Sequence, residues 1–263
     1  MERTTEAAQR RGIDIVGPSD ARSVVFVHGA MFSRKLWAPQ RDALAEEYRV
    51  VAPDLPGHGD RSDETFDLER AISVLDDALE SAAGGHAILV GLSLGGYLAT
   101  AYANRYPEKV DGLVIVGASA NPIRGLNVLT RATAGIVGLA TRFDTVERGV
   151  QRLGERWVRN RDISPAQKRE IVESGIFPRE FATPGPDLAG RNFRVRLAAF
   201  DGPVLVINGE HDKIMRRGER DHAVVGDADV VVLEGVGHVC NLHRPETFTE
   251  AVRQFARRVD APV

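Results

Sequence analysis

The chain has 263 residues, a length that suits one large α/β unit carrying an insertion better than two separate domains. Lys and Arg number 34 and Asp and Glu number 37, which gives a formal net charge of −3, and hydrophobic residues make up 43% of the chain. This near-average balance excludes a disordered chain, a collagen-like chain and a generally basic nucleic-acid-binding protein.

The cysteine count and the N-terminal segment exclude further classes of protein. Cys240 is the only cysteine, so an internal disulfide framework and a cysteine-rich zinc site are excluded, and we expect no metal. The N-terminal run MERTTEAAQRRG is polar and lacks the apolar segment of a signal peptide. No stretch approaches about 18 consecutive apolar residues, so no membrane span is expected. We therefore expect a soluble, cytoplasmic protein with no membrane and no nucleic-acid partner.

Six short apolar runs, rich in Val, Ile or Leu, recur along the chain and end near Gly, Pro, Asp or Asn. Strands that are covered by helices on both faces have this pattern. Helix-like segments lie between most of the runs, and this alternation predicts an α/β fold with a mostly parallel sheet. The runs are Val24–Val27, Val50–Ala52, Ala87–Val90, Leu113–Val116, Val204–Ile207 and Val230–Leu233, and the helical segments include Glu69–Ala83, Leu94–Tyr106 and Pro245–Arg258.

The alternation stops between Asn121 and Phe200, where the pattern is helical. Ser164-Pro165 is a helix start, with Ser as the N-cap and Pro in the first turn. Residues 121–196 contain 14 Lys or Arg and 8 Asp or Glu, a net charge of +6 that leaves about −9 for the rest of the chain. We interpret residues 121–200 as a helical cap on a core made of residues 1–120 and 201–263, the whole forming a single structural unit.

The sharpest motif is Gly91-Leu92-Ser93-Leu94-Gly95, directly after one predicted strand and directly before a predicted helix. It fits the G-x-S-x-G pattern, in which a strained turn exposes the serine above the carboxyl edge of a sheet. A serine hydroxyl is a poor nucleophile unless a base removes its proton. The N-terminus of the following helix favours negative charge beside the serine. Ser93 is therefore the candidate nucleophile.

A base and an acid must accompany such a serine. His238 follows the last predicted strand, and it is the candidate base. Asp212 follows the preceding strand and is the candidate acid that orients the base, while Glu210, closer to the strand end, remains the alternative. For the other histidines a packing, surface or turn role is expected: these are His28, His58, His86, His211, His222 and His243.

The second donor to an oxyanion should come from the loop after the first predicted strand. A backbone N–H serves in this role, so we expect the N–H of Ala30 to act with that of Leu94, and Met31 is the fallback. His28 and Met31 are also candidate substrate contacts. Arg124 is the candidate partner of a carboxylate-bearing substrate, although arginines on helices more often face solvent.

Together these motifs resemble the α/β-hydrolase superfamily over nearly the whole chain. Its serine-triad members have the chain order Ser–acid–His that is found here. The resemblance implies an eight-stranded, mostly parallel sheet with a helical cap after the sixth strand, an acyl-serine intermediate and no cofactor. Ser93 stands where haloalkane dehalogenases and epoxide hydrolases carry aspartate, so those chemistries are disfavoured. The motifs that carry the resemblance are His28-Gly29 with Trp37, Asp54–Gly59, the Ser93 turn, Gly209–Asp212 and Gly237-His238.

The C-terminal pattern Gly237–Leu242, followed by Arg244–Glu246, is similar to that of 3-oxoadipate enol-lactonases and small esterases. This resemblance implies a carboxylic ester hydrolase that cleaves a small ester or lactone. We expect it to be a monomer or homodimer with a small-molecule substrate. Hydrolysis of a C–C bond, perhydrolase activity and acyl transfer by the same triad stay open as alternatives. A ligand-binding protein without catalysis is disfavoured, because such a protein needs no complete triad.

Overall fold

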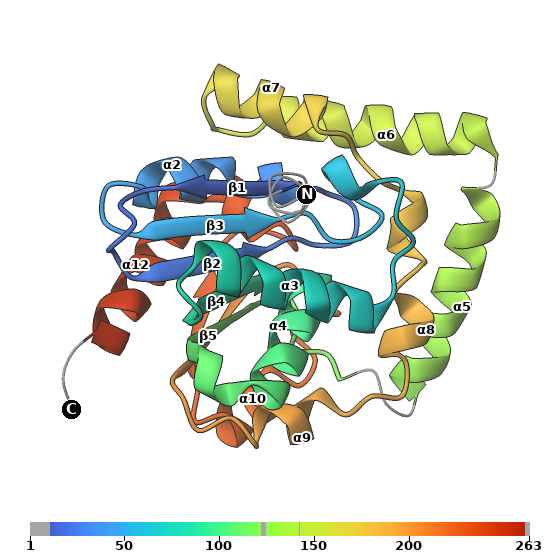
Figure 1. The fold of residues 1–263 in the computed structure, drawn as a ribbon. Helices are drawn as coiled ribbons and strands as arrows, with labels where there is room; N and C mark the ends of the chain where they lie inside the picture. Colours follow the sequence, from blue (N-terminus) through green and yellow to red (C-terminus); the bar gives the residue numbers. More distant parts are fainter. Residues whose placement is uncertain (1–10, 122–124, 142, 261–263) are drawn as a thin grey trace, which may run out of the picture.

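A computed structural model describes residues 11–121, 125–141 and 143–260. Its described residues form a seven-stranded sheet in the order β1-β3-β2-β4-β5-β6-β7, in which only β1 runs antiparallel to its neighbour (Figure 1). The strands are β1 (Ile13–Val16), β2 (Ser23–Val27), β3 (Arg49–Pro53), β4 (Ala87–Leu92), β5 (Val110–Val116), β6 (Val204–Gly209) and β7 (Asp229–Leu233). The predicted α/β fold with a mostly parallel sheet is confirmed.

All six strands expected from apolar runs are present as β2 to β7, and one strand was missed. Ile13–Val16 has a charged residue at Asp14 and is only half-buried, so it shows no continuous apolar run. The eight strands implied by the resemblance are not reached in the described residues, which contain seven. The long insertion therefore follows β5, the fifth described strand, and not a sixth.

Alternation of side chains in the strands divides the core into two layers. In β2, Val25 and Val27 pack on the side of α3 (Leu68–Ala82) and α4 (Leu94–Arg105). Val24 and Phe26 pack on the opposite side, against α2 (Ala38–Leu44), α11 (Cys240–His243) and α12 (Pro245–Asp260). Helices thus cover both faces, as continuous apolar strands require.

The segment between β5 and β6, residues 121–200, is called the cap segment below. Its described residues contain helices and no strand. The predicted helix start is confirmed, because Ser164 accepts a hydrogen bond from the N–H of Gln167, whose side chain bonds back to the Ser164 N–H. The helices are α5 (Gly125–Ala140), α6 (Asp144–Arg159), α7 (Pro165–Glu173), α8 (Gly185–Leu188) and α9 (Phe193–Leu197).

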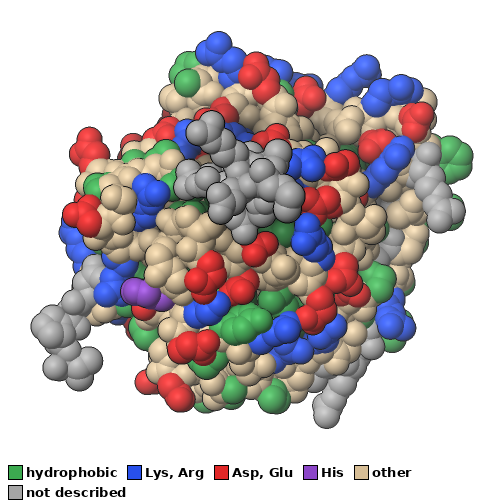
Figure 2. All heavy atoms as spheres, in the orientation of Figure 1, with side chains coloured by type: hydrophobic (Ala, Val, Ile, Leu, Met, Phe, Trp, Pro, Cys, Tyr) green, Lys and Arg blue, Asp and Glu red, His purple; other side chains and the backbone are tan. Residues whose placement is uncertain are grey.

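The cap helices extend around the core, from α7, which lies against α2, to α9, which packs against α4 and α10 (Glu219–Val225). Figure 1 shows α6 and α7 crossing above β1 and α2, with α5 descending beside them. Figure 2 shows Lys and Arg side chains along the upper edge of the molecule, over α6 and α7. Within the part of the chain that is described, no helix is long and apolar enough to cross a bilayer.

Candidate active site

Ser93 lies in a sharp turn between β4, the central strand, and α4. Its backbone has φ 54° and ψ −112°, a conformation that is strained for a residue with a Cβ. Neighbouring glycines make the turn possible, because a Cβ on Gly91 would lie 2.2 Å from the Gly95 oxygen and a Cβ on Gly95 would lie 2.1 Å from the Val27 oxygen. The G-x-S-x-G motif therefore forms the predicted strand–turn–helix, with Ser93 at the carboxyl end of the strand.

The expected oxyanion donors lie in two neighbouring backbone segments. Gly29 to Phe32 form a turn, closed by the Phe32 N–H on the Gly29 oxygen at 3.3 Å, with Ala30 in its middle. Gly29 lies against the Ser93 turn, since a Cβ there would be 3.5 Å from the Ser93 Cβ. Neither Ala30 nor Leu94 donates its N–H to a described residue, so both groups are available to an oxyanion.

Asp212 and His238 form a hydrogen-bonded pair in the site. The Nδ1 of His238 is 2.6 Å from an Oδ2 oxygen of Asp212, and the carboxylate is buried while the ring is partly exposed. Because a carboxylate only accepts, Nδ1 donates, and Nε2 is left with the lone pair that a general base needs. The other Asp212 oxygen accepts the Met215 N–H at 3.3 Å, which holds the carboxylate in place.

Glu210, the alternative acid, has a different role in the structure. Its carboxylate accepts the N–H of Gly235 at 2.8 Å and is exposed, and no hydrogen bond joins it to His238. It braces the loop that carries the histidine. The geometry therefore favours Asp212 over Glu210 as the acid that orients His238.

The end of β5 lies between the Ser93 turn and the Asp212–His238 pair. The Ser93 N–H donates to the Val116 oxygen at 2.8 Å, and a Cβ on the next residue, Gly117, would lie 3.0 Å from His238 Nδ1. The three candidate residues therefore converge at one sheet edge. Among the described contacts no hydrogen bond joins Ser93 to His238, a bond that often tightens only when substrate binds. Gly117, with φ 55°, was missed by the sequence reasoning, since its need for space comes from a loop 121 positions away.

His28 lies beneath the oxyanion turn and is fully buried. Its Nε2 accepts the Leu55 N–H and its Nδ1 is bonded to the Gly29 oxygen, both at 2.9 Å. Burial holds the pKa of His28 well below its ordinary value, so the ring is neutral and Nδ1 donates. These contacts support the packing role that the sequence indicated and not a direct substrate contact.

The other candidate contacts are placed as follows. Met31 is half-buried in the oxyanion turn, and its carbonyl oxygen accepts the Phe177 N–H at 2.9 Å. Arg124 lies outside the described residues.

Tyr97, on α4, was missed by the sequence reasoning: its hydroxyl is buried and donates to the Ala120 oxygen at 2.5 Å. Burial and the nearby Asp212 raise the pKa of Tyr97, so it stays a neutral donor.

A cysteine nucleophile and a metal centre are two other kinds of catalytic site, and the described residues support neither. Burial raises the pKa of Cys240 to about 12, so this thiol is no nucleophile. The described residues contain no cluster of His, Cys, Asp and Glu that could hold a metal ion. Both observations leave the Ser93 region as the candidate site.

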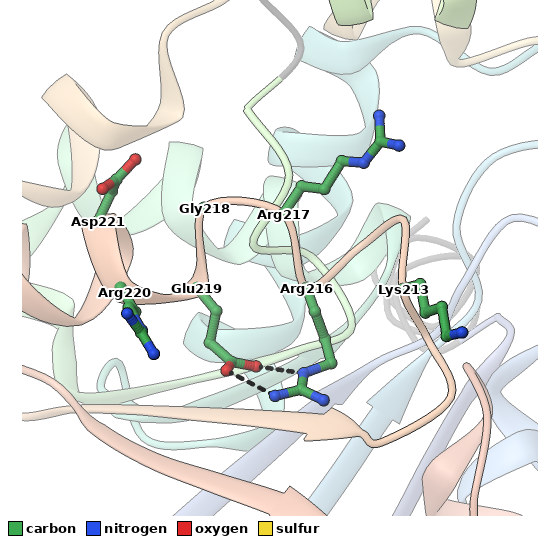
Figure 3. Close-up of a pocket in the computed structure, with 7 residues that line it drawn as sticks. All are labelled: Lys213, Arg216, Arg217, Gly218, Glu219, Arg220 and Asp221. Carbon is green, nitrogen blue, oxygen red and sulfur yellow. Dashed lines mark hydrogen bonds and ion pairs between the residues drawn. The ribbon is translucent and has the colours of Figure 1, made fainter.

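A basic pocket of about 510 Å³ follows Asp212 in the chain (Figure 3). Arg216 is paired with Glu219 at 3.0 Å, while Lys213, Arg217 and Arg220 point in three different directions. Because these side chains do not converge on one point, they do not form a binding site for an anion.

Comparisons with known proteins agree with this geometry. A family model described as the alpha/beta hydrolase family matches residues 24–251. The chain is 26% identical to carboxylesterase YbfK of Bacillus subtilis (strain 168), over 91% of this chain and 81% of that protein. A thermophilic esterase from Thermogutta terrifontis superposes with a TM-score of 0.75 at 25% identity, over 95% of this chain and 93% of the other. The enol-lactonase of Burkholderia xenovorans LB400 superposes with a TM-score of 0.70 at 23% identity, over 93% and 95%, a likeness in fold alone.

Proposed function

Because the chain belongs to the alpha/beta hydrolase family, as its motifs indicated, we propose that it is a serine hydrolase of small carboxylic esters or lactones. One observation supports this most directly: the Asp212–His238 pair, 2.6 Å between Oδ2 and Nδ1, lies at the same sheet edge as the strained Ser93 turn. A ligand-binding protein has no need of an oriented base at the same sheet edge as a half-buried serine in a strained turn. The similarity to carboxylesterase YbfK supports the ester as the substrate class.

The proposed acylation follows from the geometry. His238 Nε2 takes the proton of Ser93 Oγ as this oxygen bonds to the substrate carbonyl carbon, and the carbonyl electron pair moves onto its oxygen. The N–H groups of Ala30 and Leu94 stabilise the resulting oxyanion. When it collapses, the bond to the leaving oxygen breaks, and the imidazolium, stabilised by Asp212, returns the proton to the alkoxide.

Deacylation repeats the sequence with water. His238 removes a proton from water as the water oxygen attacks the acyl-serine carbon. Collapse of the second oxyanion breaks the bond to Ser93 Oγ, which takes the proton back from His238. The acid is released and the site is restored without a cofactor. We propose that the protein does this in the cytoplasm on a small-molecule substrate, as a monomer or homodimer.

The test of this proposal is Ser93→Ala, assayed with p-nitrophenyl esters of graded chain length beside a panel of lactones. Loss of the nucleophile should lower kcat by several orders of magnitude and leave the thermal unfolding midpoint near that of the wild type. A fluorophosphonate probe should add its mass to Ser93 in the wild type and not in the variant.

The matched control is Ser81→Ala, because Ser81 is exposed on α3 and bonds only to the backbone of its own helix. This variant should keep full activity and full labelling. Turnover by Ser93→Ala within about tenfold of the wild type would show that another group attacks the ester.

A further inference from the structure

Three consecutive carbonyl groups of the oxyanion turn are each held by a donor. The Gly29 oxygen is bonded by His28 Nδ1, the Ala30 oxygen by His58 Nε2 and the Met31 oxygen by the Phe177 N–H, all at 2.9 Å. The donors come from three separate parts of the chain: the end of β2, the turn after β3, and the cap segment. The third donor is unexpected, because it attaches the cap segment to the catalytic loop.

These carbonyl contacts control the direction of N–H groups. A trans peptide is planar, so a carbonyl and the N–H of the following residue point in opposite directions. Holding the Gly29 and Ala30 carbonyls therefore aims the N–H groups of Ala30 and Met31, the expected donor and its fallback. The Ala30 and Met31 carbonyls flank the Met31 residue, so His58 and Phe177 fix both of its peptide planes.

His58 is completely buried and has no access to substrate. Its Nδ1 is 2.9 Å from the Pro56 oxygen, so the ring lies between two backbone carbonyls, one from its own turn and one from the oxyanion turn. A neutral imidazole donates to only one of them, and the tautomer with the proton on Nε2 donates to the Ala30 oxygen. Its ring meets Phe177 edge-on, with centroids 5.5 Å apart. The ring thus lies between the core, the oxyanion turn and the cap segment.

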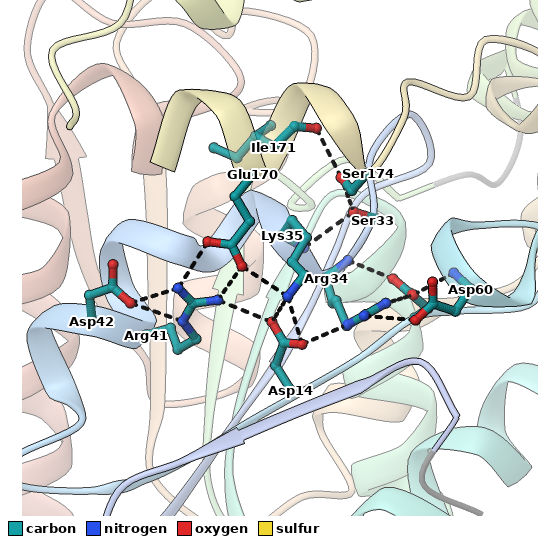
Figure 4. Close-up of polar contacts among 11 residues, drawn as sticks. Asp14, Ser33, Arg34, Lys35, Arg41, Asp42, Asp60, Glu170, Ile171 and Ser174 are labelled. Atoms are coloured by element: carbon teal, nitrogen blue, oxygen red, sulfur yellow. Dashed lines mark hydrogen bonds and ion pairs between the residues drawn. The ribbon is translucent and has the colours of Figure 1, made fainter. Parts of the chain in front are cut away.

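The cap segment is attached firmly beside this point. Ser33 donates to the Ser174 hydroxyl at 2.7 Å, and Ser174 donates to the Ile171 oxygen at 2.9 Å (Figure 4). Glu170, on α7, pairs with Lys35 at 2.9 Å and Arg41 at 2.6 Å. The position of the Phe177 N–H is therefore fixed by the docking of α7.

We propose that His58 and the backbone N–H of Phe177 are positioning groups for the oxyanion turn, so that the docked cap segment supports the chemical step toward every ester. This inference rests on the proposed function. It goes further than a cap that only selects substrates, because a selecting cap alters KM and specificity, whereas a misaimed N–H lowers kcat for all substrates alike.

The first test compares His58→Leu with His58→Gln. The amide of Gln can donate to the Ala30 oxygen and Leu cannot, and both side chains are neutral and similar in size. His58→Leu should lower kcat by about 10–100-fold with KM changed less than about threefold, and His58→Gln should recover most of the loss. Inhibition by an aryl boronic acid, which forms a tetrahedral adduct on serine, should weaken in parallel with kcat/KM.

The second test removes the cap donor alone. Phe177→Pro lacks the N–H and Phe177→Leu keeps it, while both lose the aromatic ring. The Pro variant should show the lower kcat, in the same proportion for a short and a long ester. Hydrogen–deuterium exchange of residues 29–33 should be faster in the Pro and His58→Leu variants than in their partners, a readout that needs no turnover.

Three results would overturn the inference: equal kcat in both members of each pair, a loss confined to KM, or equal exchange of residues 29–33. Loss of kcat in both members of a pair together with a lower unfolding midpoint would show a purely structural role. Failure of the proposed function is separate, because the wild type would then neither hydrolyse esters nor be labelled at Ser93, while the exchange comparison would still decide the role of the contacts.

Discussion

Ser93 carries backbone strain that the surrounding residues must offset. A residue with a Cβ at φ 54° and ψ −112° costs on the order of 1–3 kcal/mol. The turn persists because its N–H is bonded to Val116 and its carbonyl accepts the N–H groups of Gly96 and Tyr97, at 2.8, 3.0 and 3.2 Å. The strain keeps the hydroxyl at the end of the central strand, where a carbonyl substrate can approach it.

At this scale we expect Asp212→Asn and Glu210→Gln to behave differently. The amide of Asn can donate to Nδ1 and favours the wrong tautomer of His238, so kcat should fall by about 10³–10⁴-fold in a folded protein. Glu210→Gln changes a loop contact on the Gly235 N–H, so its kcat should stay within about tenfold of the wild type. Steady-state kinetics decides between them, and the reverse ranking would move the acid to Glu210.

The sequence could predict Ser93, Asp212 and His238 as candidates because each lies in the loop or turn that follows an apolar run, and parallel strands end at one edge. It could not predict the roles of His58 and Phe177. Those depend on contacts to Ala30 and Met31 over 28 and 146 positions, and no local pattern encodes such contacts.

α7 is attached to the core by ion pairs, and their contribution to stability depends on pH. The hydrogen bond from Arg41, with that from Lys35, holds the pKa of Glu170 below its ordinary value despite partial burial. For Asp14, burial acts to raise the pKa, but hydrogen bonds from Lys35 and Arg34 outweigh it and the net pKa is lowered. Both carboxylates therefore add stability above their unfolded pKa values, and this stability is lost as the pH falls through their folded values.

We expect Glu170→Gln to lower the free energy of unfolding at pH 7 by about 1.5–3 kcal/mol, because two charge-assisted contacts are weakened. The difference from the wild type should shrink in acid, once the pH falls through the lowered folded pKa of Glu170 and its carboxylate becomes protonated. Glu173→Gln is the control, since Glu173 is exposed on the same helix and has no ion pair with a described residue. Urea unfolding across pH measures the effect, and a pH-independent difference would contradict it.

Local signals determine how well each element can be predicted. Ser164 and Pro165 predict the start of α7, because the N-cap and the first-turn proline are adjacent in the sequence. The docking of α7 was beyond prediction, since Lys35 and Glu170 are 135 positions apart. Even β7, correctly predicted from an apolar run, is exposed at Val230, because it forms the edge of the sheet.

At the scale of the whole molecule, the buried apolar side chains form two layers, one on each face of the sheet. On one side Phe26, Trp37 and Phe248 form an aromatic stack, with centroid distances of 4.9 and 5.8 Å, and all three side chains are completely buried. The cap segment, by contrast, exposes large apolar side chains such as Phe143.

We therefore expect Phe248→Ala to cost about 3–5 kcal/mol of unfolding free energy, through lost burial and the cavity left behind. Phe143→Ala is the matched control, because the Phe143 side chain is 63% exposed and its removal should change stability by less than about 0.5 kcal/mol. Chemical denaturation of the two variants tests the contrast. Similar losses in both would mean that the cap segment contributes as much to the cooperative unit as the core.

β5 and β6 are neighbours in the sheet, yet the end of β5 at Val116 and the start of β6 at Val204 are 88 positions apart in the chain. The entropy of closing a loop grows only with the logarithm of its length, so this excursion costs about 2 kcal/mol more than a connection of about 10 residues. An insertion between β5 and β6 therefore lowers the free energy of unfolding only slightly, and cap segments of other lengths can connect the same two strands. If the Phe177 N–H positions the oxyanion turn as proposed, an active graft must bring a backbone N–H to the Met31 carbonyl, at the place that Phe177 now fills.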